Sequence, residues 1–221
     1  ELNDSAERQR LFINSLSHEI KTPITSIMAR AETLLSRDIS ESDRLRSLKR
    51  IREQCVWLER LSGKLETLTM LEGSFKMKPA SVPALFKFVK TVVSDSLLEK
   101  NISLVSECNI STLPMDADLM SIALCNLIEN AKRASEENSC IALTAHDNFL
   151  EVSDNGQGIP PKDIDRVTEP FYMVDRSRSK KSGGIGLGLA LVAQIAQVHG
   201  ITLKINSTVG KGTSVRLIWN N

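Results

Sequence analysis

The first third of the chain consists of two long helical patterns joined by a short polar turn. Apolar residues recur at helical spacing in residues 1–36 and again in residues 43–72, and residues 38–43 between them are polar. Ser42 or Asp43 is expected to cap the second helix. Two amphipathic helices joined in this way form a hairpin. One hairpin cannot cover both of its apolar stripes, so two hairpins are expected to pair as a four-helix bundle in a homodimer.

The first helical pattern carries a histidine on its polar side. If Ile13 and the apolar residues at seven-residue intervals after it share one heptad position, His18 faces outward. Glu19 is its neighbour, and Thr22 lies one turn further on the same face. Pro23 removes a backbone donor and is expected to loosen the helix. This arrangement suits a nucleophile that a second protein must reach, although an exposed helical histidine is more often an ordinary surface residue.

Composition excludes several classes of protein. A net charge of +1 over 221 residues gives no general nucleic-acid or membrane surface. The four cysteines are far apart and lack metal-ligand spacing, so they are expected to be reduced core residues of a cytoplasmic protein. No apolar run is long enough to span a membrane, and any membrane contact is expected only through a part preceding residue 1. The cysteines are Cys55, Cys108, Cys125 and Cys140.

The hydrophobic period changes after Gly73, which predicts two domains, residues 1–73 and 74–221. Helices mixed with mostly antiparallel strands indicate that the second domain is a two-layer α/β sandwich. The predicted helices are residues 83–100, 116–135 and 188–199, and the predicted strands are residues 102–107, 139–145, 149–152, 201–206 and 213–219.

Two asparagines stand one helical turn apart in the second of these helices. Asn126 and Asn130 therefore share a face, and two neutral amide oxygens suit a magnesium ion that already carries phosphate oxygens. Arg133 lies near the same face and suits a phosphate. Buried asparagines satisfied by the backbone are an equally good reading of this segment alone.

A glycine-containing loop follows the strand that ends near residue 152. Gly156 and Gly158 permit close approach of the backbone to a ligand. Asp154 is placed to accept a hydrogen bond from an exocyclic amine, the group that distinguishes adenine from guanine at that edge. An ordinary turn explains this segment equally well when it is considered alone.

A second glycine-rich segment, residues 183–188, leads directly into a helix. Glycines before a helix N-terminus expose amide donors to phosphate. The segment follows no strand of a βαβ unit and lacks the lysine-serine ending of a P-loop, so neither of those sites is predicted. The preceding basic residues suit a segment that folds over a triphosphate, or a solvated charged loop. They are Arg176, Arg178, Lys180 and Lys181.

Taken together, these segments resemble the sensor histidine kinases of two-component signalling, over essentially the whole chain. The family's H box matches residues 17–23, the N box residues 126–133 and the G1 box residues 154–158. The F box matches residues 170–172, the G2 box residues 184–188 and the last glycine motif residues 210–213. The resemblance implies a phosphotransfer bundle followed by a Bergerat-type ATP-binding domain.

The resemblance also implies roles for single residues. His18 is the expected phosphoacceptor, Glu19 orients or deprotonates it, and Thr22 is linked to dephosphorylation of a response regulator receiver domain. Asn126 and Asn130 are expected to hold Mg²⁺. The expected ATP-binding residues are Asn126, Asn130, Arg133, Asp154, Gly156, Gly158, Ile159, Tyr172, Arg178, Lys180, Gly184, Gly186, Leu187, Gly188 and Thr213.

The chain departs from the family pattern at three positions. Ala134 replaces a frequent aromatic residue, which removes a stacking contact worth roughly 0.5–1.5 kcal/mol. Arg133 stands where lysine is common, and Ile185 replaces a frequent threonine. Two other functions are compatible with parts of the sequence. One is an ATPase of the topoisomerase, chaperone or DNA-repair class that uses Glu129 as a catalytic carboxylate, and the other is a dimeric scaffold that binds nucleotide without transferring phosphate.

Overall fold

The computed structural model describes residues 2–36, 39–71, 75, 77–175 and 184–220. These residues form two compact units, Glu1–Thr67 and Leu68–Asn221, and each is described by itself. The predicted boundary at residue 73 and its glycine lie outside the described residues. In those residues, no helix is both long enough and apolar enough to cross a membrane.

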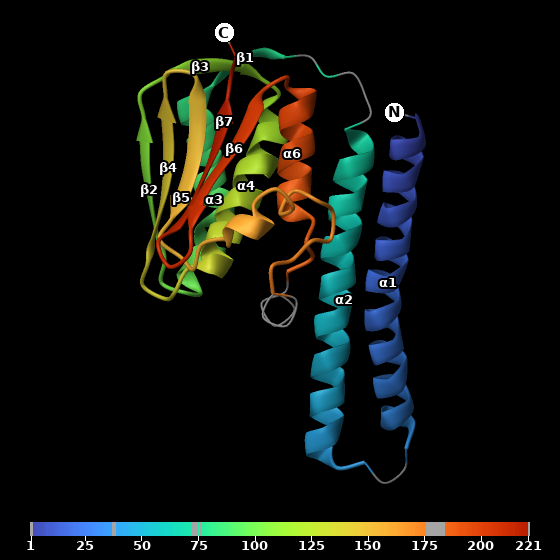
Figure 1. Cartoon of the computed structure of the whole chain (residues 1–221). Helices are drawn as coiled ribbons and strands as arrows, with labels where there is room; N and C mark the ends of the chain where they lie inside the picture. The colour runs from blue at the N-terminus through green and yellow to red at the C-terminus, as the bar shows by residue number, and fades with distance from the viewer. Residues whose placement is uncertain (1, 37–38, 72–74, 76, 176–183, 221) are drawn as a thin grey trace. The chain divides into compact units, whose positions relative to one another are not determined.

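The first unit is the helical hairpin that the sequence predicts. Helix α1 spans Leu2–Leu35 and continues through Pro23, and α2 spans Glu41–Met70 (Figure 1). The cap of α2 differs from the prediction, because Ser40 Oγ accepts a hydrogen bond from the Asp43 amide at 3.1 Å. Ser40 takes this role because it stands directly before the first helical residue, where its side chain reaches the free amides of the first turn.

The second unit is a two-layer sandwich with helices α3 (Val82–Leu98), α4 (Ala117–Ala134) and α6 (Gly188–Val198) on one face of a sheet (Figure 1). The strand order is β2-β4-β5-β7-β6. Only the β2–β4 pair is parallel, and the other three pairs are antiparallel. The strands are β2 (Ser103–Cys108), β4 (Cys140–His146), β5 (Phe149–Asp154), β6 (Thr202–Thr208) and β7 (Gly212–Ile218).

A second, smaller sheet was missed by the sequence analysis. Strand β1 (Lys78–Ser81) pairs antiparallel with β3 (Thr112–Met115). Both are four residues long and contain a proline, so neither is long enough to be recognised as a strand from its sequence pattern. The Trp219 indole donates a hydrogen bond to the Pro114 carbonyl at 2.8 Å, which ties this sheet to the end of β7.

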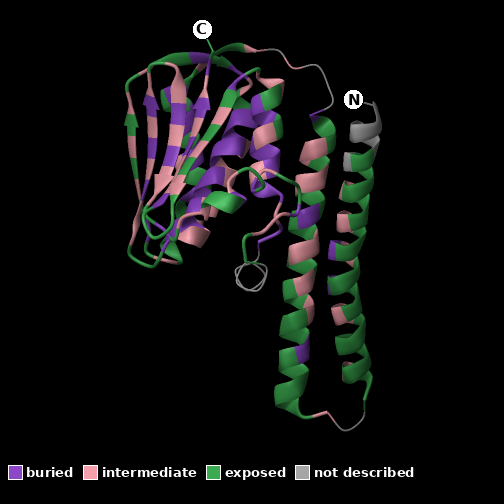
Figure 2. Ribbon diagram, in the orientation of Figure 1, coloured by how far each residue is buried: buried purple, intermediate pink, exposed green. Residues whose placement is uncertain are grey.

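Helix α4 is the centre of the core of the second unit. Met120, Ala123 and Leu124 on this helix are completely buried. Asp116 begins the helix, since its Oδ1 accepts hydrogen bonds from the amides of Asp118 and Leu119 at 3.1 Å. Figure 2 shows buried residues concentrated in this unit, whereas most of the hairpin surface is exposed. Because α4 is packed in the core, the backbone positions of its polar residues are fixed.

The cysteines are free, as expected, and Cys108 and Cys125 pack against the hydrophobic core, but the prediction that all four are core residues fails at Cys55. Cys55 on α2 is exposed, and Cys108, Cys125 and Cys140 are only partly buried.

Candidate functional site

The histidine of α1 lies on the exposed side of the hairpin, beside a buried carboxylate. The side chain of His18 is 72% exposed and that of Glu19 is 6% exposed, and His18 Nδ1 lies 4.0 Å from Glu19 Oε1. Because Nδ1 faces the carboxylate, Nε2 is the ring nitrogen available to an incoming group. The Thr22 hydroxyl donates to the His18 carbonyl at 3.2 Å, so it lies on the same turn.

In the second unit, both predicted metal-binding asparagines face the start of α6. The Asn126 amide nitrogen donates to the Ile122 carbonyl at 2.8 Å, which fixes the orientation of the side chain. A Cβ atom on Gly188 would lie 3.2 Å from Asn130 Oδ1 and 3.5 Å from Asn126 Oδ1. Glycine at the first position of α6 therefore leaves room beside both amide oxygens, and the N-terminus of this helix favours an anion there.

These two oxygens fit a magnesium ion that arrives with a nucleotide. Magnesium prefers oxygen ligands and keeps several waters, so few protein donors are needed. In the described part of the chain, no group of three or more His, Cys, Asp or Glu residues is placed to hold a metal ion. The amide oxygens of Asn126 and Asn130, which both lie beside Gly188, are the donors that fit such an ion.

Arg133 lies beside the same pair of asparagines. Its Nη1 lies 3.3 Å from Asn130 Oδ1, and its Nη2 lies 3.4 Å from Glu129 Oε1. The guanidinium lies within one helical turn of Asn130, whose side chain lies beside Gly188 at the start of α6. It therefore adds positive charge where the sequence predicts a phosphate.

Asp154, at the end of β5, has one carboxylate oxygen fixed by the backbone. Its Oδ1 accepts hydrogen bonds from the Gly156 amide at 2.8 Å and the Thr213 amide at 3.3 Å. Burial raises the pKa of Asp154, and the two amide hydrogen bonds lower it by less. Oδ2 receives no hydrogen bond from the residues that the structure describes, so it is the oxygen available to an amine.

A serine that the sequence analysis missed joins the two glycine loops beside Asp154. The Ser207 hydroxyl accepts a hydrogen bond from the Ile159 amide at 2.8 Å and contacts Thr213 Oγ1 at 2.8 Å. It also contacts the Gly212 carbonyl at 3.0 Å. Ser207 is one polar residue of an alternating strand, and the sequence contains no signal that separates it from its neighbours. Its contacts hold Ile159 and Thr213, both predicted site residues, next to Asp154.

Gly158 is required by this loop for two separate reasons, and its replacement gives a stability prediction. Its φ is +69°, and a Cβ atom there would overlap the Thr208 carbonyl. Gly158→Ala is expected to lower the free energy of unfolding by about 3 kcal/mol, as the sum of a left-handed backbone and a backbone clash. Gly200→Ala is the matched control, because φ there is +65° with nothing within 4 Å. Gly200→Ala is expected to lower the free energy of unfolding by about 1 kcal/mol. Urea unfolding of both variants checks this, and equal losses would contradict it.

The predicted F box packs against the predicted G2 box. The Phe171 amide donates to the Gly186 carbonyl at 2.8 Å, and both Phe171 and Leu187 are buried. The Tyr172 hydroxyl donates to Asp163 Oδ1 at 2.6 Å, and the Arg166 guanidinium lies 4.3 Å from the centre of the tyrosine ring. Tyr172 is thus held by its own loop.

The fold brings predicted site residues of the second unit together in small groups. Asn126 and Asn130 meet Gly188, Asp154 meets Gly156 and Thr213, and Ile159 is held by Ser207. Gly184 and Gly186 belong to the segment that leads into α6. Arg178 and Lys180 lie outside the described residues, together with the rest of the predicted basic segment.

Comparison with known families identifies both units. Residues 8–74 match the His Kinase A (phospho-acceptor) domain, and residues 115–220 match the histidine kinase-, DNA gyrase B- and HSP90-like ATPase family. The order of these two domains is that of a sensor histidine kinase, and the chain belongs to this family.

Named relatives agree with this assignment. The sensor histidine kinase YkoH of Bacillus subtilis is 29% identical over 98% of this chain, and the phosphate regulon sensor protein PhoR of Pseudomonas aeruginosa is 34% identical over 92% of it. The chain spans 48% of the length of each, about half of either protein.

Solved structures show the same fold. The histidine kinase AdeS of Acinetobacter baumannii matches with a TM-score of 0.69 at 21% identity, covering 92% of this chain and 98% of that one. The histidine kinase ThkA, in a complex with the response regulator protein TrrA, matches with a TM-score of 0.72 at 21% identity, covering 98% of this chain and 64% of that one. The predicted fold class, a helical hairpin followed by an α/β sandwich of the Bergerat type, is therefore confirmed.

Proposed function

We propose that this chain is the kinase region of a sensor and transfers the γ-phosphoryl group of ATP to His18. The observation that carries the proposal is the convergence of Asn126, Asn130 and Gly188 in one unit, in a chain whose other unit presents an exposed histidine. The family matches support the same assignment, a phospho-acceptor domain for the first unit and an ATPase-type domain for the second. Asp154 would bind the adenine amine through Oδ2, and Arg133 would meet the phosphates.

The transfer is a displacement at phosphorus. A lone pair of His18 Nε2 forms the bond to the γ-phosphorus, while the bond to the bridging oxygen breaks and its electron pair leaves with ADP. The ring becomes positively charged, and Glu19 beside Nδ1 compensates this charge and takes up the proton. Magnesium, held by Asn126 and Asn130, would neutralise phosphate charge. The protein's own contribution is alignment, as in other phosphoryl transfers.

The phosphohistidine would pass its phosphoryl group to an aspartate of a response regulator receiver domain. The structural relative ThkA was solved with such a regulator, which supports a partner of this class. We also propose that Thr22 positions water for the reverse reaction, dephosphorylation of the regulator. Its hydroxyl lies on the His18 turn, and its present acceptor is only a helix carbonyl.

The role of Thr22 gives a prediction of its own. Thr22→Ala is expected to leave phosphorylation of His18 within about twofold of wild type, because the nucleophile and Glu19 are unchanged, and to slow regulator dephosphorylation roughly tenfold or more. Thr22→Ser keeps the hydroxyl and is the control. Release of phosphate from a phosphorylated receiver domain is the measurement, and an unchanged rate in Thr22→Ala would refute the role.

A homodimer is part of the same proposal. Several large apolar side chains of the hairpin are exposed in the single chain, as is expected when a second hairpin covers them. They are Leu11, Ile13, Ile24, Met28, Leu45, Leu48 and Val56. We further propose that the chain acts in the cytoplasm and that any membrane attachment belongs to other parts of the sensor.

The competing ATPase reading requires a free carboxylate at Glu129. Both of its oxygens are engaged, Oε2 by the Ser96 hydroxyl at 3.0 Å and Oε1 by Arg133 at 3.4 Å. A carboxylate held between two partners is poorly placed to activate water. This arrangement, together with the His Kinase A match over residues 8–74, favours phosphoryl transfer to histidine over hydrolysis.

The experiment that tests the proposal is incubation with Mg²⁺ and γ-labelled ATP. Label that stays on the protein in alkali and is lost in acid identifies a phosphohistidine. Nucleotide binding without any protein-bound label would overturn the kinase proposal and favour the scaffold reading.

A further inference from the structure

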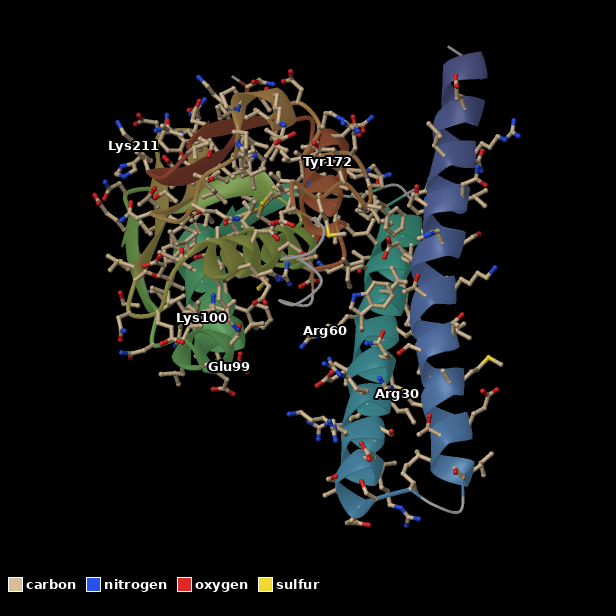
Figure 3. The ribbon with its side chains drawn as sticks, turned by 60° about the horizontal axis from the view of Figure 1, so that its bottom comes forward. Arg30, Arg60, Glu99, Lys100, Tyr172 and Lys211 are labelled. Carbon is tan, nitrogen blue, oxygen red and sulfur yellow. The ribbon has the colours of Figure 1, made fainter. Side chains whose placement is uncertain are left out.

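Helix α4 carries a buried lysine on the side that faces α3. The side chain of Lys132 is 10% exposed, and its Nζ donates to Ser96 Oγ and to Glu99 Oε2, both at 2.8 Å. Both acceptors belong to the end of α3, where Figure 3 labels Glu99 and Lys100. A buried ammonium group needs such partners, because its desolvation is otherwise costly.

The hydrogen bonds around Ser96 can run in only one direction. A lysine ammonium group only donates, and an ionised glutamate only accepts. Ser96 has one hydroxyl hydrogen, so it accepts from Lys132 and must donate to Glu129 Oε2, which lies 3.0 Å away. Lys132 thereby polarises Ser96 and fixes the position of the Glu129 carboxylate.

The other oxygen of the same carboxylate holds Arg133. Glu129 Oε1 accepts from Arg133 Nη2 at 3.4 Å, while Nη1 of the same guanidinium reaches Asn130 Oδ1 at 3.3 Å. A continuous polar network therefore runs from Glu99 on the surface of α3, through Lys132, Ser96 and Glu129, to the proposed nucleotide site.

We propose that Glu129, held by Ser96 and Lys132, is a positioning residue that orients Arg133 toward the phosphates of the bound nucleotide. This inference rests on the proposed function. An arginine side chain loses much rotational freedom on binding, and fixing one edge of its guanidinium beforehand reduces that cost. Lys100 secures the same end of α4, since its Nζ donates to the carbonyls of Lys132 and Ser135 at 3.0 and 3.1 Å.

The test is Glu129→Asp, measured by calorimetric titration with ADP and with adenosine. Aspartate keeps the charge but is one methylene shorter, so its carboxylate cannot span from Ser96 to Arg133. We expect the affinity for ADP to fall about five- to tenfold and that for adenosine to stay unchanged, because only ADP carries phosphates for Arg133. Glu137→Asp, at an exposed position just after α4, is the matched control and should bind both ligands like wild type.

A double-mutant cycle separates positioning from a structural effect. In the Arg133→Gln background, Glu129→Asp is expected to cause no further loss of ADP affinity, since the residue that it positions is gone. An equal loss of ADP and adenosine affinity, or an undiminished loss in the Arg133→Gln background, would overturn the inference. If the wild type binds ADP and Glu129→Asp binds it with the same affinity, the inference is overturned but the proposed function is not. If the wild type binds neither ADP nor adenosine, the proposed function is overturned as well.

Discussion

Replacing His18 with glutamine is expected to abolish the acid-labile label that γ-labelled ATP leaves on the protein. Glutamine is similar in size and hydrogen-bonding capacity, but it has no ring nitrogen with a lone pair for phosphorus. Its side chain would stay exposed beside Glu19, so the hairpin should fold normally. The measurement is label per protein after a fixed time, with ADP affinity as the check that the second unit is intact.

The two other histidines provide the controls for this loss. His146 lies at the β4–β5 hairpin, where Nδ1 contacts the Asn109 amide at 2.9 Å, and His146→Gln should keep wild-type labelling. His199 is less suitable, because its Nδ1 meets the Ile195 carbonyl at 2.8 Å and its Nε2 accepts from the Asp116 amide at 3.1 Å. Label retained by His18→Gln and lost in His146→Gln would refute His18 as the acceptor.

Replacing Asp154 with asparagine is expected to weaken ATP binding about a hundredfold. Asparagine Oδ1 can still accept from the Gly156 and Thr213 amides, which leaves its NH₂ group where Asp154 Oδ2 stood. Two donors, this NH₂ group and the adenine amine, would then face each other. Loss of a charge-assisted hydrogen bond and an unsatisfied donor together cost about 3 kcal/mol. Calorimetric titration with ATP measures it, and GTP should gain relative to ATP, because guanine has a carbonyl oxygen, an acceptor, in place of the adenine amine.

Asp154→Asn should not lower the free energy of unfolding, so a loss of ATP affinity in this variant can be assigned to binding and not to misfolding. Burial raises the native pKa of Asp154 above its ordinary value of 3.8, so the native state binds the proton more tightly than the unfolded state. The free energy of unfolding therefore falls as the pH rises from below 3.8 through the raised pKa, and the cost of the ionised group is fully present at neutral pH. Asp154→Asn removes that cost. A marked loss of stability at pH 7 in urea unfolding would contradict this account.

The helices and long strands were predictable because their hydrophobic periods are unambiguous. Helix α4 shows a clear helical stripe, and β4 alternates buried and partly buried residues along its whole length. Strands β1 and β3 were not predictable, since four residues that include a proline are too few to establish a strand pattern. The cap at Ser40 was misplaced by two or three residues because several polar residues in a row offer the same capping chemistry.

Some residues of the candidate site were likewise predictable from the sequence, and others were not. Asn126 and Asn130 were predictable because a helical spacing fixes their relative placement. Ser207, Asp163 and the network through Ser96 and Lys132 were not, since each depends on which distant segment packs against it. Sequence spacing determines neighbours within one element, whereas contacts between elements require the tertiary fold.

The position of β7 has a consequence for synthesis of the chain. This strand follows every other strand in the sequence, yet it lies inside the sheet, between β5 and β6. While the chain emerges from the ribosome with its N-terminal part first, β5 has a bare edge and β6 has no partner. Both remain open to mispairing and aggregation until β7 inserts between them. The ATP-binding unit thus cannot assemble gradually as it is translated, and a truncated product that lacks β7 would leave an open edge on β5 and an unpaired β6, a target for chaperones or proteases.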